Sequence, residues 1–554
     1  MPYRLFQKGL GILLRRQTNI LSAAFVIMLT VIFSQILGLV RQRLLVAIFG
    51  PSNILGVYLA STKLPDLLFQ IIIAGALSTA FIPIFSDFLS KNKKDDAHKM
   101  ASTLLTISLI IFSFFAVLLS IFAPFFLQLL NLGSGFSKEQ MDLMANLMRV
   151  IIFGQLLFVV GTFFSAVLQS YNHFFIPGIA AALFNLGMII SIVVFSPFVG
   201  IYAPAFGVVL GAFIFIIIQL PMIRNIGFYF KPSFSLKVPG IFEVTKLMWP
   251  RTISIAVLQL GSVVTVTLIS FLQSSGRNYV LFDYAQTLAF APIVLFGQTI
   301  AQAAFPVLSK EKDRLNEFRV TFVTSFSQIF YLILPISVLF LVLRIPIVRL
   351  IYGASQFDWQ ATVLTGKILA FFSISIFAQA LTFLILRGFY ALHDTKTPLI
   401  IGSITTIFMV IFGCIFILYY KFGVESIAFA YSLSNILNLI ILVIFLDRKI
   451  KEIIKMDLIL PILKTILASV FTGLALYVPI KLLDQLVFDT TRTINLIFLT
   501  GISSFLGLSL YLFLTWFLNL KEAMTFILLF KKIGNWREIL GKSGEVIDGT
   551  RLKA

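Results

Sequence analysis

Four charged side chains lie within or close to the two apolar runs of residues 34–86, and these are Arg41, Arg43, Lys63 and Asp66. A charge at the middle of a membrane costs about 2.5–3.5 kcal/mol per residue on insertion scales. Such side chains are therefore expected to face a polar cavity, a partner or the membrane interface. Arginine and lysine in a cavity would bind an anionic group through charge-assisted hydrogen bonds.

On the first run, Ser34, Gly38 and Arg41 are spaced to share one helical face, with small residues beside the charge. This spacing favours a cavity wall on which Arg41 meets an anion. The alternative is that Arg41 and Arg43 lie near enough to the helix end to reach the interface with their long side chains. We favour the cavity for Arg41 and the interface for Arg43.

On the second run, Lys63, Asp66 and Gln70 share a face at i, i+3 and i+7. The alternative to a cavity role is a structural ion pair between Lys63 and Asp66. Pro65 predicts a kink in this helix, and Gly75 is interpreted as a close-packing position.

In the second half of the chain, Asp283, Gln286 and Thr287 predict another polar helix face. Arg251 follows Pro250 near the expected start of its helix, where it serves as a ligand or as an interface anchor.

The composition indicates that these residues lie in membrane-spanning elements. The chain has 554 residues, of which 59% are hydrophobic and 12% charged, with a mean hydropathy of +1.02. Apolar runs of membrane-spanning length recur about fourteen times. Since lipid leaves no partner for backbone polar groups, these runs must be helices. The sequence predicts an all-α polytopic membrane protein with about 14 transmembrane helices.

The net charge of +20 fits this class better than nucleic-acid binding. If the N-terminus is cytoplasmic, most lysines and arginines lie in the cytoplasmic segments, as the positive-inside rule requires. The opposite connections hold Lys138, Arg277, Arg349, Lys421, Lys481 and Arg492. We therefore expect a multi-pass protein of a bacterial cytoplasmic membrane with both termini in the cytoplasm and no nucleic-acid partner.

Two short patterns recur along the chain. Pro177 and Pro398 each open an apolar helix after an aromatic residue and a histidine, and Pro83 and Pro306 lie in similar stretches. The offsets are about 221 and 223 residues, so a six-helix unit is used twice in the same orientation. Such a repeat places a substrate site between the halves.

The predicted organisation has six parts. In order they are an interfacial segment (1–19), a six-helix lobe (20–223), a linker (224–240), a second six-helix lobe (241–450), two extra helices (451–518) and a cytoplasmic tail (519–554). The turn at Gly50 separates the first two helices, and the first helix is expected to stay uncleaved.

Signatures of catalysis are absent from the sequence. There is no HExxH or GxSxG motif, the only cysteine is Cys414, and the three histidines fall in predicted connections. The stretch GNWREILGKS (534–543) lacks the glycine spacing of a phosphate-binding loop. We expect neither an enzyme nor a cofactor or metal site.

Several stretches together resemble the lipid II flippases of the MurJ (MviN) type. They are SQILGLVRQRLL (34–45), IFGP (48–51), KLPDLL (63–68), AGALSTAFIPIFSD (74–87), LQSYNHFFIPGIAAALFN (168–185) and RGFYALHDTKTP (387–398). The resemblance implies two lobes around a cationic cavity and a groove at the last two helices for a polyprenyl tail. The implied cargo is a polyprenyl-pyrophosphate-linked peptidoglycan precursor, moved by alternating access.

The resemblance carries over unevenly to single residues. Arg41 and Lys63 match the family's helix-1 arginine and helix-2 lysine. Elsewhere polar or apolar residues replace the family's charged ones, and these are Gln35, Gln42, Phe69-Gln70, Ala74, Gln286-Thr287 and Phe290. The predicted substrate-binding residues are Arg41, Lys63, Gln35, Gln70, Arg251 and Gln286, and the predicted structural residues are Gly38, Gly50, Pro65, Gly75, Pro177 and Pro398.

Three hypotheses follow. The leading one is a lipid II flippase whose partners are the lipid, the membrane and cell-wall synthesis proteins. The second is an exporter of another lipid-linked oligosaccharide or of a small cation, for which Asp66 and Asp283 are the embedded carboxylates. The third is a non-transporting scaffold that binds a partner through residues 519–554.

Overall fold

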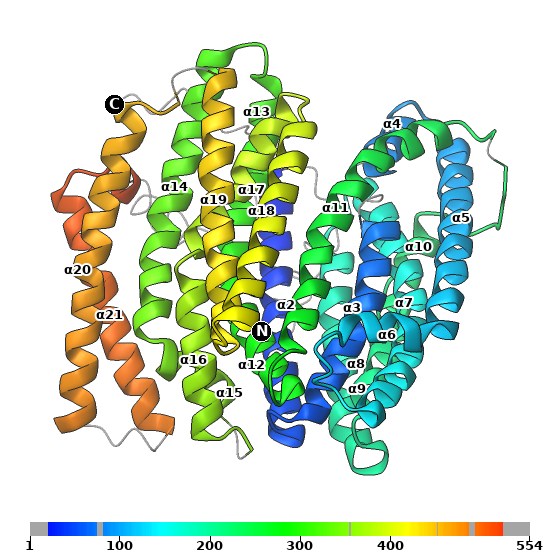
Figure 1. Ribbon diagram of the computed structural model, residues 1–554. Coiled ribbons are helices and arrows are strands. Elements are labelled where there is room, and N and C mark those ends of the chain that lie inside the picture. The colour runs from blue at the N-terminus through cyan, green and yellow to red at the C-terminus, as the bar shows by residue number, and fades with distance from the viewer. Residues whose placement is uncertain are drawn as a thin grey trace, which may run out of the picture.

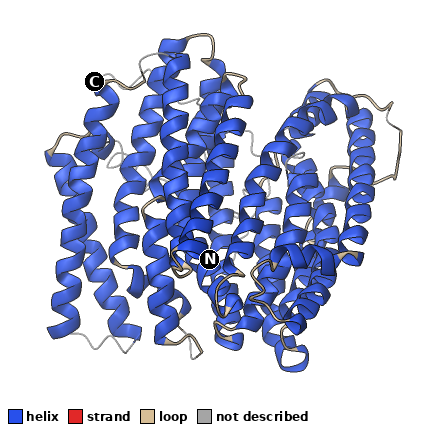
Figure 2. Cartoon of the chain, in the orientation of Figure 1, coloured by secondary structure: helices blue, strands red, loops and turns tan. Residues whose placement is uncertain are grey.

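The computed structural model describes residues 20–74, 81–235, 237–353, 356–450, 453–486 and 493–524, and within these ranges the chain is built from helices and loops without a β-strand (Figures 1 and 2). The predictions for 1–19 and for residue 75, and most of those for 519–554, fall outside the described residues.

The first half of the chain forms nine α-helices and a π-helical segment in the described ranges. They are α2 (Ile20–Phe49), α3 (Asn53–Phe69), η1 (Gln70–Ala74), α4 (Ile82–Ser90), α5 (Lys94–Ile121), α6 (Ala123–Leu130), α7 (Lys138–Ser170), α8 (Phe175–Val199), α9 (Tyr202–Ile217) and α10 (Leu220–Asn225).

The second half forms the helices α11 (Ile241–Ile269), α12 (Ser275–Pro292), η3 (Ile293–Gln298), α13 (Thr299–Lys310), α14 (Leu315–Val342), α15 (Arg344–Tyr352), α16 (Trp359–Ser373), α17 (Ile376–Ala391), α18 (Lys396–Cys414), η4 (Ile415–Tyr419) and α19 (Glu425–Ile450). Two further helices, α20 (Met456–Leu486) and α21 (Thr493–Phe517), pack on each other and on α14 and α15 at one edge of the molecule (Figure 1).

Twelve helices of the described chain are long and apolar enough to cross a membrane, and the bent pair of α16 and α17 makes thirteen. The remaining expected span is α11, whose apolar stretch in the described residues is the shorter Gln259–Ile269. The expectation of about 14 spans is close to this result. The fold class predicted from the sequence is confirmed.

The two halves share structural details at a constant offset of 221 residues. The break between α5 and α6 at Phe122 matches the break between α14 and α15 at Leu343. Left-handed residues at Asn172 and His393 precede α8 and α18, in which Pro177 and Pro398 are each the third residue. Proline is tolerated in the first turn because backbone N–H groups there have no hydrogen-bond acceptor within the helix.

The second predicted helix differs from the expectation. Pro65 is buried within a continuous α3, and the regular helix gives way only at Gln70, where the π-helical η1 begins. The equivalent α12 also leads into a π-helical segment, η3. Such segments are frequent at functional sites.

The bundle of helices has two ends. The Gly50 end carries the turn between α2 and α3, and the Lys91 end carries the turn between α4 and α5. In Figure 1, α3–α10 and α12–α21 form two groups that diverge toward the Lys91 end at the top and approach each other at the Gly50 end. Helix α11 lies between them and contacts α3 and α6 as well as α18.

Candidate functional site

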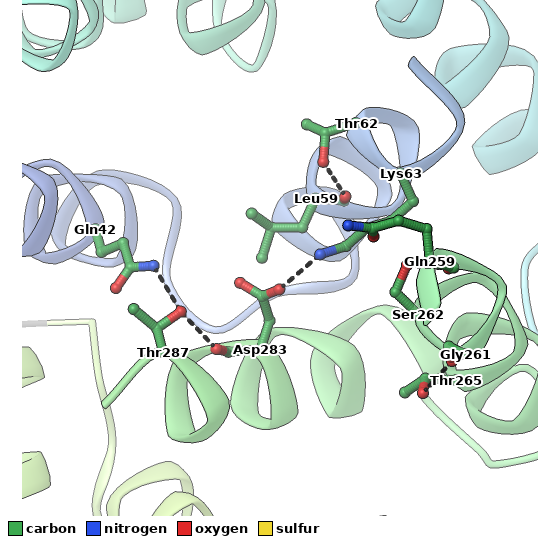
Figure 3. Close-up of polar contacts among 10 residues, drawn as sticks. All are labelled: Gln42, Leu59, Thr62, Lys63, Gln259, Gly261, Ser262, Thr265, Asp283 and Thr287. Atoms are coloured by element: carbon green, nitrogen blue, oxygen red, sulfur yellow. Dashed lines mark hydrogen bonds and ion pairs between the residues drawn. The ribbon is translucent and has the colours of Figure 1, made fainter. Parts of the chain in front are cut away.

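An ion pair joins the two groups of helices. Lys63 Nζ of α3 lies 3.0 Å from Asp283 Oδ1 of α12 (Figure 3), with 22% and 15% of the two side chains exposed. Lys63 also lies over the ring of Tyr279, 5.6 Å from its centroid. The two helices occupy equivalent positions in the repeat, so the pair lies where the halves meet.

The alternative of a Lys63–Asp66 pair is wrong in this conformation. Gln155 Nε2 of α7 donates to Asp66 Oδ1 at 2.7 Å, while Lys63 turns to the other half. The sequence does place both residues on one face of α3, but it does not reveal which carboxylate Lys63 selects. That choice depends on the packing of α3 against α12.

Gln42 forms a second connection between the halves. Its Nε2 donates to Thr287 Oγ1 at 3.1 Å, and the Tyr352 hydroxyl donates to its Oε1 at 2.8 Å. The Tyr284 hydroxyl donates to the Gln42 carbonyl oxygen at 3.1 Å. Figure 3 shows Gln42, Thr287 and Asp283 in one chain of hydrogen bonds. The buried glutamine is thus satisfied by neutral partners, as a low-dielectric site requires.

The side chain of Arg41, on α2, binds only within the first half of the chain. Its Nη1 donates to Asn185 Oδ1 at 3.0 Å and contacts Met188 Sδ at 3.1 Å, both on α8. Asn185 in turn donates to the backbone oxygen of Ser34 at 3.3 Å. The Nε of Arg41 is buried without a hydrogen-bond partner in the described structure. One N–H donor of this guanidinium is therefore unsatisfied in this conformation.

The Gly50 end is closed by direct backbone contact between the halves. A Cβ on Gly56 would lie 2.1 Å from the Gly276 carbonyl oxygen, and a Cβ on Gly276 would lie 2.5 Å from the Asn53 carbonyl oxygen. The backbone N–H of Arg277 donates to Asn53 Oδ1 at 2.9 Å. Only glycine permits this approach.

Polar contacts reinforce the closure. The Arg277 guanidinium binds both oxygens of Asp358 at 2.9 and 3.0 Å, and Asp358 also caps α16 through the Ala361 N–H. Partial burial raises the pKa of Asp358, but the hydrogen bonds from Ala361 and Arg277 outweigh it and hold that pKa below its usual value. Arg43 donates to the Leu350 carbonyl oxygen at 2.9 Å, which puts it at the Gly50 end rather than in a cavity.

A small polar cavity of about 420 Å³ lies in this closure. It is lined by Phe49, Gly50, Pro51, Ser52, Asn53, Ser274, Arg277, Gln356 and Asp358. Gly50 adopts a φ of +64°, which explains why a glycine directly follows α2. Gly50 is recognisable from the sequence, whereas Gly56, Gly276 and Asp358 are not, because their roles depend on contacts between distant segments.

The other predicted binding residues do not gather around Lys63 and Arg41. Gln35 is exposed on α2, Gln70 is half-buried at the start of η1, and Gln286 is half-buried beside the Tyr431 hydroxyl. Among the described side chains, these three make no hydrogen bond to Arg41 or Lys63. Arg251 is the eleventh residue of α11, well past the start of that helix at Ile241, and its side chain lies outside the description. The expectation that Arg251 is near the helix start is wrong.

The structural glycine and proline positions also differ in role. A Cβ on Gly38 would meet no atom within 4 Å, so this glycine faces open space rather than a packed helix. Pro65, Pro177 and Pro398 are buried in their helices. Gly75 lies outside the described residues.

These features define a membrane transporter of two related helical groups, closed at one end and joined by an ion pair between its halves. The sequence profile of the lipid II flippase MurJ family matches residues 45–496. The chain belongs to this family. As the family consists of lipid flippases, the chain is a transporter and not an enzyme, located in the inner membrane with many spans.

Individual relatives agree with the assignment. A probable lipid II flippase MurJ of Buchnera aphidicola subsp. Baizongia pistaciae is 25% identical over 429 residues, which cover 76% of this chain and 83% of the relative. One of Vibrio cholerae is 27% identical over 440 residues, covering 76% and 82%. A solved structure of the lipid II flippase MurJ in an inward closed conformation has the same fold, with a TM-score of 0.73, 24% identity and coverage of 89% and 98%.

Proposed function

We propose that this chain translocates lipid II, a polyprenyl-pyrophosphate-linked peptidoglycan precursor, across the cytoplasmic membrane by alternating access. The observation that carries the proposal is Lys63, a partly exposed cation between two equivalent helices of a lipid II flippase fold. A lysine at this point contacts whichever anion enters between the halves, and its partner Asp283 belongs to the half that must move.

The diphosphate of the lipid is the group that Lys63 and Arg41 would bind. Arg41 has a buried Nε without a partner in the described structure, and its Nη1 is held only by uncharged groups. Lys63 pairs with Asp283 Oδ1 but has three N–H donors, so both cations have capacity for charge-assisted hydrogen bonds to an anion. We propose that Gln35, Gln70, Gln286 and Arg251 line the path of the attached sugar and peptide.

The proposed orientation follows from charge. The Lys91 end carries basic turns and is cytoplasmic on the positive-inside rule, which puts both termini in the cytoplasm. The closed Gly50 end then faces the opposite side, so this conformation would receive cargo from the cytoplasmic leaflet. The polyprenyl tail would lie along α20 and α21, which expose a nearly continuous apolar surface. Cell-wall synthesis proteins that make or use the lipid are the proposed partners.

The test is a lipid II flipping assay in cells depleted of their own flippase. The wild type should restore flipping, and Lys63→Ala combined with Arg41→Ala should reduce it at least about tenfold, because two charge-assisted contacts of about 1.5–3 kcal/mol are lost. Lys138→Ala, at the start of α7, is the matched control. Failure of a membrane-inserted wild type would overturn lipid II as cargo, and an active double variant would overturn the assignment of these two residues.

A further inference from the structure

Asp66 is a half-buried carboxylate whose hydrogen-bond donor is uncharged. It accepts from Gln155 Nε2 at 2.7 Å, and none of the ion pairs in the described chain includes it. A carboxylate within a membrane span is costly unless it is paired or protonated.

Gln155, the hydrogen-bond partner of Asp66, lacks a donor that a protonated Asp66 would supply. Gln155 Oε1 is a buried acceptor with no hydrogen-bond donor among the described atoms. An ionised carboxylate has no proton to offer it, whereas a protonated one donates an O–H. A neutral Asp66 and the Gln155 amide therefore form a mutually satisfied pair, with one hydrogen bond in each direction.

Lys63 connects this pair to the movement of the halves. It lies three residues before Asp66 on α3, within reach of that carboxylate, but in this conformation it binds Asp283 across the interface at 3.0 Å. When α12 moves away from α3, Lys63 loses Asp283 and keeps Asp66 as the carboxylate on its own helix. Asp283 is then left in the opened space, where water hydrates it.

We propose that Asp66 is a proton-binding site whose occupancy is linked, through Lys63, to closure of the Gly50 end. When the Gly50 end closes, Lys63 pairs with Asp283, and Asp66, which then has no cation beside it from Lys63, takes a proton from water. When the Gly50 end opens, Lys63 pairs with Asp66, and the carboxyl group of Asp66 releases its proton to water. The inference rests on the alternating movement in the proposed function, but not on the identity of the cargo.

The other charged and titratable groups around Asp66 do not reverse this linkage. Arg41 of α2 is held by Asn185 and Met188 in the same half, so its charge acts on Asp66 in both conformations. Tyr58 is buried on α3, and Tyr279 of α12 lies on Lys63. Because the closed state binds more protons, lower pH favours closure and higher pH favours opening.

The experiment measures the distance between the halves in the purified full chain, in lipid nanodiscs without cargo. Spin labels at Lys93→Cys and Asp313→Cys, both exposed at the Lys91 end, report the separation in a Cys414→Ala background. Between about pH 5 and about pH 9, the wild type should change from the long to the short distance. Asp66→Asn, which stays neutral, should keep the long distance throughout.

Two further variants sharpen the result. Asp283→Asn frees Lys63 for Asp66 in the closed state, so its transition should move to lower pH by about one unit or more. Asp142→Asn, the same change at an exposed carboxylate of α7, should titrate like the wild type. The proposal is overturned if the wild type does not respond to pH, if Asp66→Asn responds like the wild type, or if sodium at fixed pH produces the change instead. Since the nanodiscs contain no lipid II, a failure of lipid II flipping would leave this result standing.

Discussion

Gly56 and Gly276 bring the backbones of α3 and α12 into direct contact, since a Cβ on Gly56 would lie 2.1 Å from the Gly276 carbonyl oxygen. The three atoms nearest to that Cβ are all backbone atoms of Gly276, which cannot move aside as a flexible side chain can. The Gly50 end therefore closes because the first turns of α3 and α12 pack backbone against backbone. The Lys63–Asp283 pair lies further along the same two helices.

Gly56→Ala should prevent this closure. Overpacking of this kind costs about 1–3 kcal/mol, so the ratio of closed to open protein should fall about fivefold or more. This change is visible as a shift to the short distance between labels at Lys93→Cys and Asp313→Cys. Gly38→Ala is the matched control, because its new methyl group would meet no atom within 4 Å. An unchanged distance in Gly56→Ala would mean that the contact does not limit closure.

Because of the Arg277–Asp358 pair, we expect the protein to lose thermal stability in acid. Hydrogen bonds hold the pKa of Asp358 below its usual value, so its contribution is present above the unfolded-state pKa and disappears as pH falls through the folded-state pKa. The wild type should therefore lose more thermal stability than Asp358→Asn on going from about pH 7 to about pH 3. The difference should be about 1 kcal/mol or less, because the side chains of the pair are 35% and 48% exposed and solvent screens them.

Differential scanning fluorimetry across this pH range measures the effect. Asp142→Asn, on an exposed carboxylate of α7, should follow the wild type at every pH. Equal acid losses in the wild type and in Asp358→Asn would contradict the assignment.

Much of the fold was predictable because lipid imposes helices on apolar runs, and because a repeat leaves marks in the sequence. Pro177 and Pro398 reveal the offset of 221 residues, and the structure repeats it at Phe122 and Leu343. Helix breaks at large apolar residues carry no comparable signal. The break between α5 and α6 is therefore visible only in the structure.

The site was less predictable. The sequence identifies Lys63 as an embedded cation but offers Asp66 and Asp283 as partners without a means to choose. The choice is set by the approach of α3 to α12, which depends on Gly56 and Gly276. Glycines in apolar helices are common, so neither residue stands out before the two helices are placed together.

Tyr352→Phe should weaken the closed state through Gln42. The Tyr352 hydroxyl donates to Gln42 Oε1 at 2.8 Å, and its removal leaves a buried acceptor without that donor. Such a loss costs about 1–3 kcal/mol, which should lower the melting temperature of this 554-residue protein by about 1–3 °C. Tyr420→Phe, at an exposed ring near the end of η4, should leave the stability unchanged. If both variants melt like the wild type, Gln42 has another donor in solution.

Variants of the Lys63–Asp283 pair separate the structural role of Lys63 from its proposed role in cargo binding. Lys63→Met alone leaves Asp283 without its cation, so closure should weaken about tenfold or more in the label-distance measurement. Lys63→Met combined with Asp283→Leu removes both charges and should close like the wild type, because an apolar pair of similar size replaces a partly buried ion pair at little cost. The double variant should nevertheless fail to flip lipid II, since the anion contact is gone.

The control is Lys91→Met with Asp87→Leu, the same replacement at an exposed ion pair, which should both close and flip lipid II. Flipping by the Lys63–Asp283 double variant would show that Lys63 only holds the halves together, and normal closure of Lys63→Met would show that it does not hold them at all.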